Sequence, residues 1–147
     1  MIKIHTTAIV DKKAKLADDI EVGPYTIIGP NAEIGKGSVI GSHAIVEGCT
    51  TIGEGNHIFT GAVIGSIPQD LKYKNKKSFL KIGKNNIIRE YVTMNPGTEE
   101  GSLTSIGDSN LFMAYSHVAH DCVKRLLSPI DVNDPSSVPG FIDVYRR

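Results

Sequence analysis

The chain has 147 residues, and its 16 Lys and Arg residues balance 16 Asp and Glu residues, so the formal net charge is zero with histidine neutral. This length allows one domain, and the balanced charge argues against proteins that bind nucleic-acid backbones or membrane surfaces through basic patches. No apolar run approaches the roughly 20 residues of a membrane span, and the first residues lack the apolar stretch of a signal peptide. We therefore expect a cytoplasmic protein with no membrane span and no nucleic-acid partner.

A repeat of six residues dominates the first half of the chain. Every sixth residue from Ile4 to Ile64 is a branched aliphatic, and glycine often follows it directly, which suits a tight corner. A period of six fits neither an α-helix nor a heptad coiled coil, but it is a multiple of the two-residue period of a strand. Short strands that always turn in the same sense would stack these side chains into one buried column, so we predict an all-β protein, a parallel β-helix of hexapeptide repeats. The column consists of Ile4, Val10, Leu16, Val22, Ile28, Ile34, Ile40, Val46, Ile52, Ile58 and Ile64.

Two polar segments interrupt the repeat without changing its phase. The first covers residues 66–81 and the second residues 95–105. Large apolar residues resume the spacing behind each break, at Ile82, Ile88, Met94, Ile106, Phe112 and Val118. An insertion that preserves the phase is expected to be a loop extruded at a corner, with stacking resuming behind it.

The last part of the chain does not follow the repeat. Lys124 stands where an aliphatic residue is due, and no six-residue phase follows it. A stack of repeats needs a covered end, so this part could be a cap, a disordered tail or the product of a disrupted reading frame. We predict a β-helix over residues 1–123 and an atypical tail over residues 124–147.

Two of the histidines stand close together in the segment HVAHDC. Val118 belongs to the inward column, so His117 is expected to point outward and His120 to lie at the corner. A neutral imidazole at this corner could accept a hydroxyl proton near neutral pH. Asp121 could fix its tautomer, although neighbouring residues of a strand face opposite ways. The alternative is a pair of surface histidines with no chemical role.

The first insertion carries polar groups suited to a ligand. Gln69, Asp70 and Lys72 place acceptors and a cation close together, and in an extended segment Asp70 and Lys72 would face the same side. Such groups suit sugar hydroxyls and a phosphate, although a merely solvated loop is the alternative. The chain contains no P-loop motif, no G-x-G-x-x-G and no HExxH, so neither a helix-bound nucleotide phosphate nor that zinc motif is indicated.

The strings IGSIPQDLKY, IGKNNIIREYVTMNPGT and GDSNLFMAYSHVAHDC, in this order, resemble the acyl-[acyl-carrier-protein]–UDP-N-acetylglucosamine O-acyltransferase family. The resemblance runs from near the N-terminus to Cys122 or Val123. It implies a left-handed β-helix with three hexads per coil and a homotrimer with clefts between neighbouring prisms. It also implies transfer of a 3-hydroxyacyl group from acyl carrier protein to the 3-hydroxyl of UDP-N-acetylglucosamine, the first step of lipid A biosynthesis.

The same resemblance assigns roles to particular residues and requires no metal or other cofactor. His120 would be the general base, and Asp121 would support it. The expected substrate-binding residues are Gln69, Asp70, Lys72 and His117.

The chain departs from the family after Cys122, where family members continue with further coils and a helical region. We therefore expect a truncated or frame-disrupted relative. Three other functions stay open at this point. The chain could acylate a different UDP-amino sugar, possibly on nitrogen, or be an inactive β-helix fragment or scaffold. It could also be a metal-dependent, carbonic-anhydrase-like β-helix enzyme with His117 and His120 as ligands.

Three hexads per coil bring the interruptions to one edge of the prism. Both insertions and the HVAHDC turn then leave directly after residues of a single wall. Loops on a rigid scaffold tend to carry chemistry, so this edge is the predicted functional one. The wall consists of Val10, Ile28, Val46, Ile64, Met94 and Val118.

Overall fold

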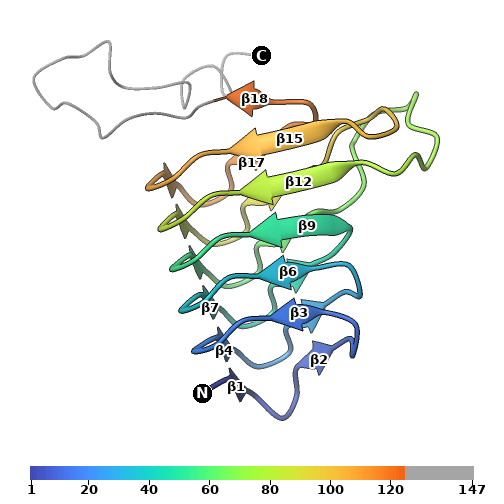
Figure 1. Cartoon of the computed structure of the whole chain (residues 1–147). Helices are drawn as coiled ribbons and strands as arrows, with labels where there is room; N and C mark the ends of the chain where they lie inside the picture. The colour runs from blue at the N-terminus through green and yellow to red at the C-terminus, as the bar shows by residue number, and fades with distance from the viewer. Residues whose placement is uncertain (125–147) are drawn as a thin grey trace, which may run out of the picture.

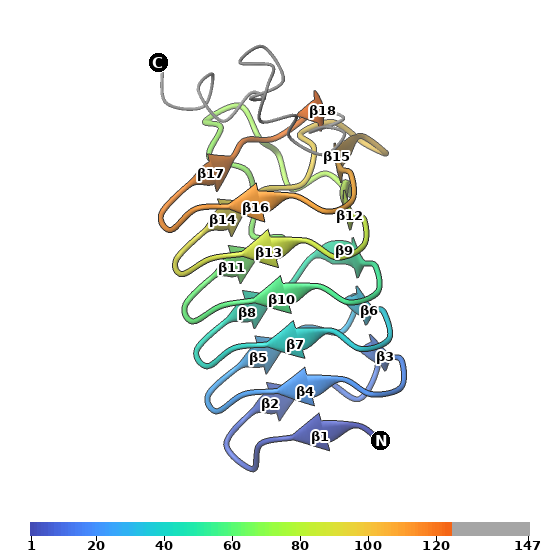
Figure 2. The same ribbon diagram turned by 90° about the vertical axis from the view of Figure 1, so that its left-hand side faces the viewer.

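The computed structural model describes residues 1–124, which wind into a left-handed parallel β-helix (Figures 1 and 2). Three parallel sheets of six strands each form its walls. Sheet A contains β1 (Lys3–Ile4), β4 (Glu21–Val22), β7 (Val39–Ile40), β10 (His57–Ile58), β13 (Ile87–Ile88) and β16 (Leu111–Phe112). Sheet B contains β2 (Ile9–Val10), β5 (Ile27–Ile28), β8 (Ile45–Val46), β11 (Val63–Ile64), β14 (Thr93–Met94) and β17 (His117–Val118). Sheet C contains β3 (Lys15–Leu16), β6 (Glu33–Ile34), β9 (Cys49–Ile52), β12 (Phe79–Ile82), β15 (Leu103–Ile106) and β18 (Val123–Lys124).

The strand register confirms three hexads per coil. Each strand pairs in parallel with the strand three positions along the chain, as Lys3 with Glu21 in sheet A, 18 residues apart. None of the described residues forms a helix long and apolar enough to cross a membrane. The predicted tail lies outside the described residues from residue 125 onward, while β18 pairs with β15.

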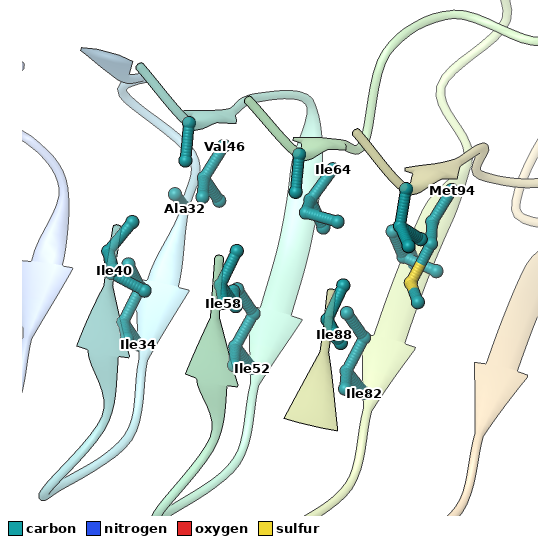
Figure 3. Close-up of a cluster of buried hydrophobic side chains, with 14 of the residues drawn as sticks. Ala32, Ile34, Ile40, Val46, Ile52, Ile58, Ile64, Ile82, Ile88 and Met94 are labelled. Atoms are coloured by element: carbon teal, nitrogen blue, oxygen red, sulfur yellow. The ribbon is translucent and has the colours of Figure 1, made fainter. Parts of the chain in front are cut away.

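The buried core is the column that the repeat predicts (Figure 3). Ile58, Ile64 and Ile88 are fully buried, and even Val118 near the last described coil is 6% exposed. In contrast, Ile4 in the first coil is 45% exposed, because only one neighbouring coil covers it. The column therefore depends on stacking, as expected for a repeat protein whose coils contact only their neighbours.

A ladder of asparagines, two buried and one partly buried, accompanies the aliphatic column between sheets C and A. The Nδ2 atom of Asn56 donates to the carbonyls of Gly53 and Gly83, both at 2.8 Å. The Oδ1 atom of Asn56 accepts from Asn86 Nδ2 at 3.0 Å, and Asn110 Nδ2 in turn donates to Asn86 Oδ1 at 2.8 Å. These amides satisfy corner carbonyls that would otherwise be buried without partners.

Close backbone approach explains most of the glycines that follow column residues. A Cβ atom on Gly35 would lie 2.5 Å from the carbonyl carbon of Gly53 in the next coil. Positive φ angles occur instead further around the same corners, for example 69° at Gly37. Most glycines that follow column residues are therefore required by the close contact between stacked corners, and not by a left-handed backbone conformation.

Both insertions leave the prism at the edge between sheets B and C, hereafter the BC edge. One joins β11 to β12 and the other joins β14 to β15, and Figure 1 shows both projecting on the right-hand side. Each ends earlier than the sequence indicated, because β12 and β15 are four residues long. Leu80 and Thr104 are buried in these strands and occupy the inward position that Thr50 fills in β9.

Candidate functional site

The three edges of the prism have different chemistry. The edge between sheets A and B carries stacked rings, such as Tyr91 and Tyr115 with centroids 5.2 Å apart. The edge between sheets C and A carries charges of alternating sign, such as Lys84 and Glu54, whose Nζ and Oε2 atoms are 3.0 Å apart. The BC edge alone receives both insertions and the turn after β17, so it is the candidate site.

His117 faces outward on β17, as the repeat predicts. Its Nδ1 atom lies 2.7 Å from Oγ1 of Thr93, which is its register partner on β14. Partial burial lowers the pKa of His117 below its usual value, outweighing the hydrogen bond to Thr93, and the nearby His120 adds to the lowering. A neutral imidazole at this place can accept or donate a hydrogen bond without repelling a second cation.

His120 and Asp121 form a contact that strand geometry alone would not allow. The Nδ1 atom of His120 lies 3.1 Å from Oδ2 of Asp121, and the two side chains are 35% and 40% exposed. Asp121 has a φ angle of 56°, so the chain turns through a left-handed residue here and does not continue as a strand. This turn brings neighbouring side chains to the same side, where the carboxylate can orient the imidazole.

The carboxylate of Asp121 is held by the second insertion. Thr98 donates its hydroxyl to Oδ2 at 2.6 Å and its backbone N–H to the same atom at 3.2 Å. The backbone N–H of Asp121 donates to Thr104 Oγ1 at 3.0 Å. Burial by itself would raise the pKa of Asp121, but the hydrogen bonds from Thr98 and His120 outweigh burial and leave the pKa below its ordinary value. Asp121 is therefore an anion near neutral pH.

The first insertion, which contains Gln69, Asp70 and Lys72, leaves the prism at the same edge. Asp70 Oδ1 accepts the backbone N–H of Lys72 at 2.8 Å, and the Asp70 carbonyl accepts the N–H of Tyr73 at 3.0 Å. The segment is therefore a turn and not an extended segment, because the Asp70 side chain accepts the backbone N–H of Lys72. Gln69 and Lys72 are exposed, and Asp70 is half-buried.

The structure brings together only some of the predicted site residues. His120 and Asp121 are in contact, and His117 lies on the strand just before them. Within residues 1–124, no hydrogen bond or ion pair joins these three residues to Gln69, Asp70 or Lys72. The two insertions contact each other instead, through the ion pair of Lys76 with Glu99 and the bond from the Gly101 N–H to the Lys77 carbonyl at 2.8 Å.

Sequence reasoning missed several residues of this edge. Thr93, Thr98 and Thr104 hold His117 and Asp121, and Asn95 is 3% exposed with an Oδ1 atom that has no partner among the described residues. Thr93 could have been found from the sequence. Counting three hexads per coil across the second insertion places it beside His117 on the neighbouring strand. In the described part of the chain, no three His, Cys, Asp or Glu side chains converge as metal ligands.

The lowered pKa of His117 predicts a pH-dependent stability. Because the unfolded imidazole titrates near 6.5 and the folded one lower, the unfolded chain binds more protons between these values. The contribution of His117 to the free energy of unfolding is present above the pKa of the unfolded state. It is lost as the pH falls through the pKa of the folded state. We expect the unfolding free energy of wild type, measured by urea denaturation between about pH 8 and about pH 5, to fall more steeply than that of His117→Gln. Parallel curves for the two proteins would contradict this origin.

Known proteins resemble this chain in sequence and in fold, although no protein-family model matches it. The acyl-[acyl-carrier-protein]–UDP-N-acetylglucosamine O-acyltransferase of Saccharophagus degradans is 55% identical over 124 residues, which are 84% of this chain and 48% of the relative. The protein of the same name from Thermodesulfovibrio yellowstonii is 43% identical over 145 residues, 98% of this chain and 55% of the relative.

Solved structures agree with the sequence comparison. The structure of LpxA from Acinetobacter baumannii superimposes with a TM-score of 0.78 at 49% identity, covering 80% of this chain and 46% of the other. The UDP-N-acetylglucosamine acyltransferase from Campylobacter jejuni gives a TM-score of 0.76 at 43% identity. The chain spans about half the length of the curated relatives it matches. Over that span, the chain is homologous to the acyl-[acyl-carrier-protein]–UDP-N-acetylglucosamine O-acyltransferases.

Proposed function

We propose that the chain acts as an O-acyltransferase that moves a 3-hydroxyacyl group from acyl carrier protein to the 3-hydroxyl of UDP-N-acetylglucosamine, the first step of lipid A biosynthesis. The observation that carries this proposal is the His120–Asp121 contact at the BC edge, with Nδ1 3.1 Å from Oδ2. The names and the 43–55% identity of the curated relatives support it.

In the proposed mechanism, His120 is the general base and Asp121 supports it. Because Asp121 accepts a hydrogen bond at Nδ1, the free electron pair of the imidazole lies on Nε2. Nε2 takes the proton from the sugar 3-hydroxyl as its oxygen attacks the thioester carbonyl. The tetrahedral intermediate collapses to the ester and releases the carrier-protein thiolate, which takes the proton back from His120. No metal and no covalent enzyme intermediate take part.

We assign substrate binding to Gln69, Asp70, Lys72 and His117. Lys72 is an exposed cation suited to a phosphate, and Gln69 and Asp70 offer hydrogen-bonding groups to sugar hydroxyls. His117, kept neutral by partial burial, would orient the acceptor sugar beside the base. The turn at Asp70 presents these groups on the same edge as His120.

Assembly as a homotrimer is supported by the outer face of sheet B. Its outward residues are aliphatic over four successive strands. In contrast, ion pairs join the first two strands on the outer faces of the other sheets, Lys3–Glu21 in sheet A and Lys15–Glu33 in sheet C. An apolar stripe of this kind is typical of a surface that another protein chain covers. The stripe consists of Ile9, Ile27, Ile45 and Val63. We place the protein in the cytoplasm.

Product analysis tests the proposed function. The chain is incubated with 3-hydroxyacyl carrier protein and UDP-N-acetylglucosamine, and the nucleotide sugars are identified by mass spectrometry before and after alkali. We expect an acylated product that alkali hydrolyses, as an ester requires. An alkali-stable amide would indicate transfer to nitrogen, and a folded chain that forms no product would be an inactive fragment.

Replacing Asp70 with alanine is expected to weaken the affinity for UDP-N-acetylglucosamine, by about tenfold if one hydrogen bond to the ligand is lost. Isothermal titration calorimetry measures this directly. The matched control is Asp11→Ala, because Asp11 Oδ1 accepts the N–H of Lys13 at 2.8 Å in the same kind of turn, several coils away on the BC edge. Equal affinities for wild type and Asp70→Ala would remove Asp70 from the site.

A further inference from the structure

We propose that Thr98 is a positioning residue that holds Asp121 against His120, so that the second insertion serves to lock the tautomer of the base. The catalytic meaning of this inference rests on the proposed function. The contact itself rests on the geometry of the second insertion.

Thr98 and His120 share one carboxylate oxygen. The Oγ1 atom of Thr98 lies 2.6 Å from Asp121 Oδ2, the Thr98 backbone nitrogen lies 3.2 Å from it, and His120 Nδ1 lies 3.1 Å from it. The Thr98 backbone N–H also lies 3.3 Å from Oδ1, so this residue contacts both oxygens of the carboxylate. The partly exposed Asp121 therefore cannot rotate away from the imidazole without breaking hydrogen bonds to a charged group, which are among the stronger ones in proteins.

The backbone around Thr98 is built for this contact. Gly97 is buried, and a Cβ atom on it would lie 2.7 Å from Asp121 Oδ1 and 2.0 Å from Ser102 Oγ. Only glycine leaves room for the insertion to approach the carboxylate so closely. Behind Thr98, the N–H of Glu99 donates to Ser102 Oγ at 3.0 Å, and the N–H of Ser102 donates to the Glu99 carbonyl at 3.0 Å. These bonds close the turn that presents the threonine.

The other end of Asp121 is anchored by a second element. Its backbone N–H donates to Thr104 Oγ1 at 3.0 Å, and Thr104 is buried in β15, directly behind the insertion. The second insertion and the strand that follows it thus bind Asp121 at both backbone and side chain. Loss of the Thr98 hydroxyl alone would remove the shortest bond to the carboxylate, at 2.6 Å, while the backbone stays in place.

The tautomer of His120 gives a direct readout. We compare wild type, Thr98→Val, Thr98→Ser and the control Thr51→Val by long-range ¹H–¹⁵N correlation spectra of the imidazole nitrogens. Thr51 is an exposed threonine on the outer face of β9, away from the site. We expect the Nδ1-protonated form of His120 to dominate in wild type, Thr98→Ser and Thr51→Val. In Thr98→Val the spectrum should move toward a mixture of tautomers, with the backbone amide spectrum of the other coils unchanged.

Two outcomes would overturn the inference. One is an unchanged imidazole spectrum in Thr98→Val, and the other is the same change in Thr51→Val. If Thr98→Val does not fold, Thr98→Ser provides the test, because it keeps the hydroxyl. Loss of the Nδ1-protonated form of His120 in Thr98→Ser would contradict the role of the hydroxyl. In turnover, Thr98→Val should lower kcat about tenfold, the equivalent of one hydrogen bond to a charged group, with the KM for UDP-N-acetylglucosamine unchanged. Because the spectra require no turnover, an inactive chain would refute the proposed function and leave the positioning contact testable.

Discussion

Replacing His120 with alanine is expected to lower the rate of acyl transfer by about 10²–10⁴-fold, the usual contribution of a positioned general base. The side chain is half-buried at a corner of the prism and contributes no packing to the aliphatic column. The loss should therefore be chemical, with far-UV circular dichroism unchanged. Initial rates at saturating UDP-N-acetylglucosamine measure it.

The matched control for this variant is His57→Ala. His57 is exposed on the outer face of β10, in sheet A, and stacks on Phe59 with ring centroids 4.3 Å apart. We expect it to retain the wild-type rate. A His120→Ala protein that transfers acyl groups as fast as His57→Ala would remove His120 from the role of base.

Replacing Ile88 with alanine is expected to destabilise the protein by about 2–5 kcal/mol, the cost of a cavity left by a buried isoleucine. Ile88 is fully buried between Ile58 below it and Phe112 above it in sheet A. A coil cannot collapse easily into the space, since its corners are fixed by the backbone bonds to both neighbouring coils. Urea unfolding at equilibrium gives the difference.

Ile87, the preceding residue of the same strand, provides the control for Ile88. It is 43% exposed on the outer face of β13. Ile87→Ala removes the same atoms from the same element, so the expected loss is below about 1 kcal/mol. Equal losses for the two variants would show that the six-residue column does not form the core.

The architecture was predictable because the six-residue repeat follows directly from the need to bury one aliphatic side chain in each short strand. A side chain such as Ile64 can be fully buried only if every coil returns an aliphatic residue to the same column, and this leaves a period of six in the sequence. The common edge of both insertions followed from the same count, and the pairing of Ile64 with Met94 and of Met94 with Val118 confirms it.

The details of the site were less accessible, since they depend on backbone that the repeat does not describe. The contact of His120 with Asp121 requires the left-handed φ of Asp121, which alternation along a strand does not predict. Thr98 reaches Asp121 from an insertion whose path has no periodicity. The turn at Asp70 depends on a side-chain acceptor that bonds the Lys72 N–H, which the repeat does not describe either.

The central claim is that the BC edge gathers the groups that bind the nucleotide sugar and the base that acts on it. Titration of the ¹⁵N-labelled chain with UDP-N-acetylglucosamine, followed by backbone amide and imidazole resonances, tests it most directly. We expect the perturbed resonances to lie in residues 65–78, 95–102 and 117–122, with the His120 imidazole among them. Perturbations confined to the outer faces of sheets A and C, or spectra that do not change at saturating nucleotide sugar, would contradict the account.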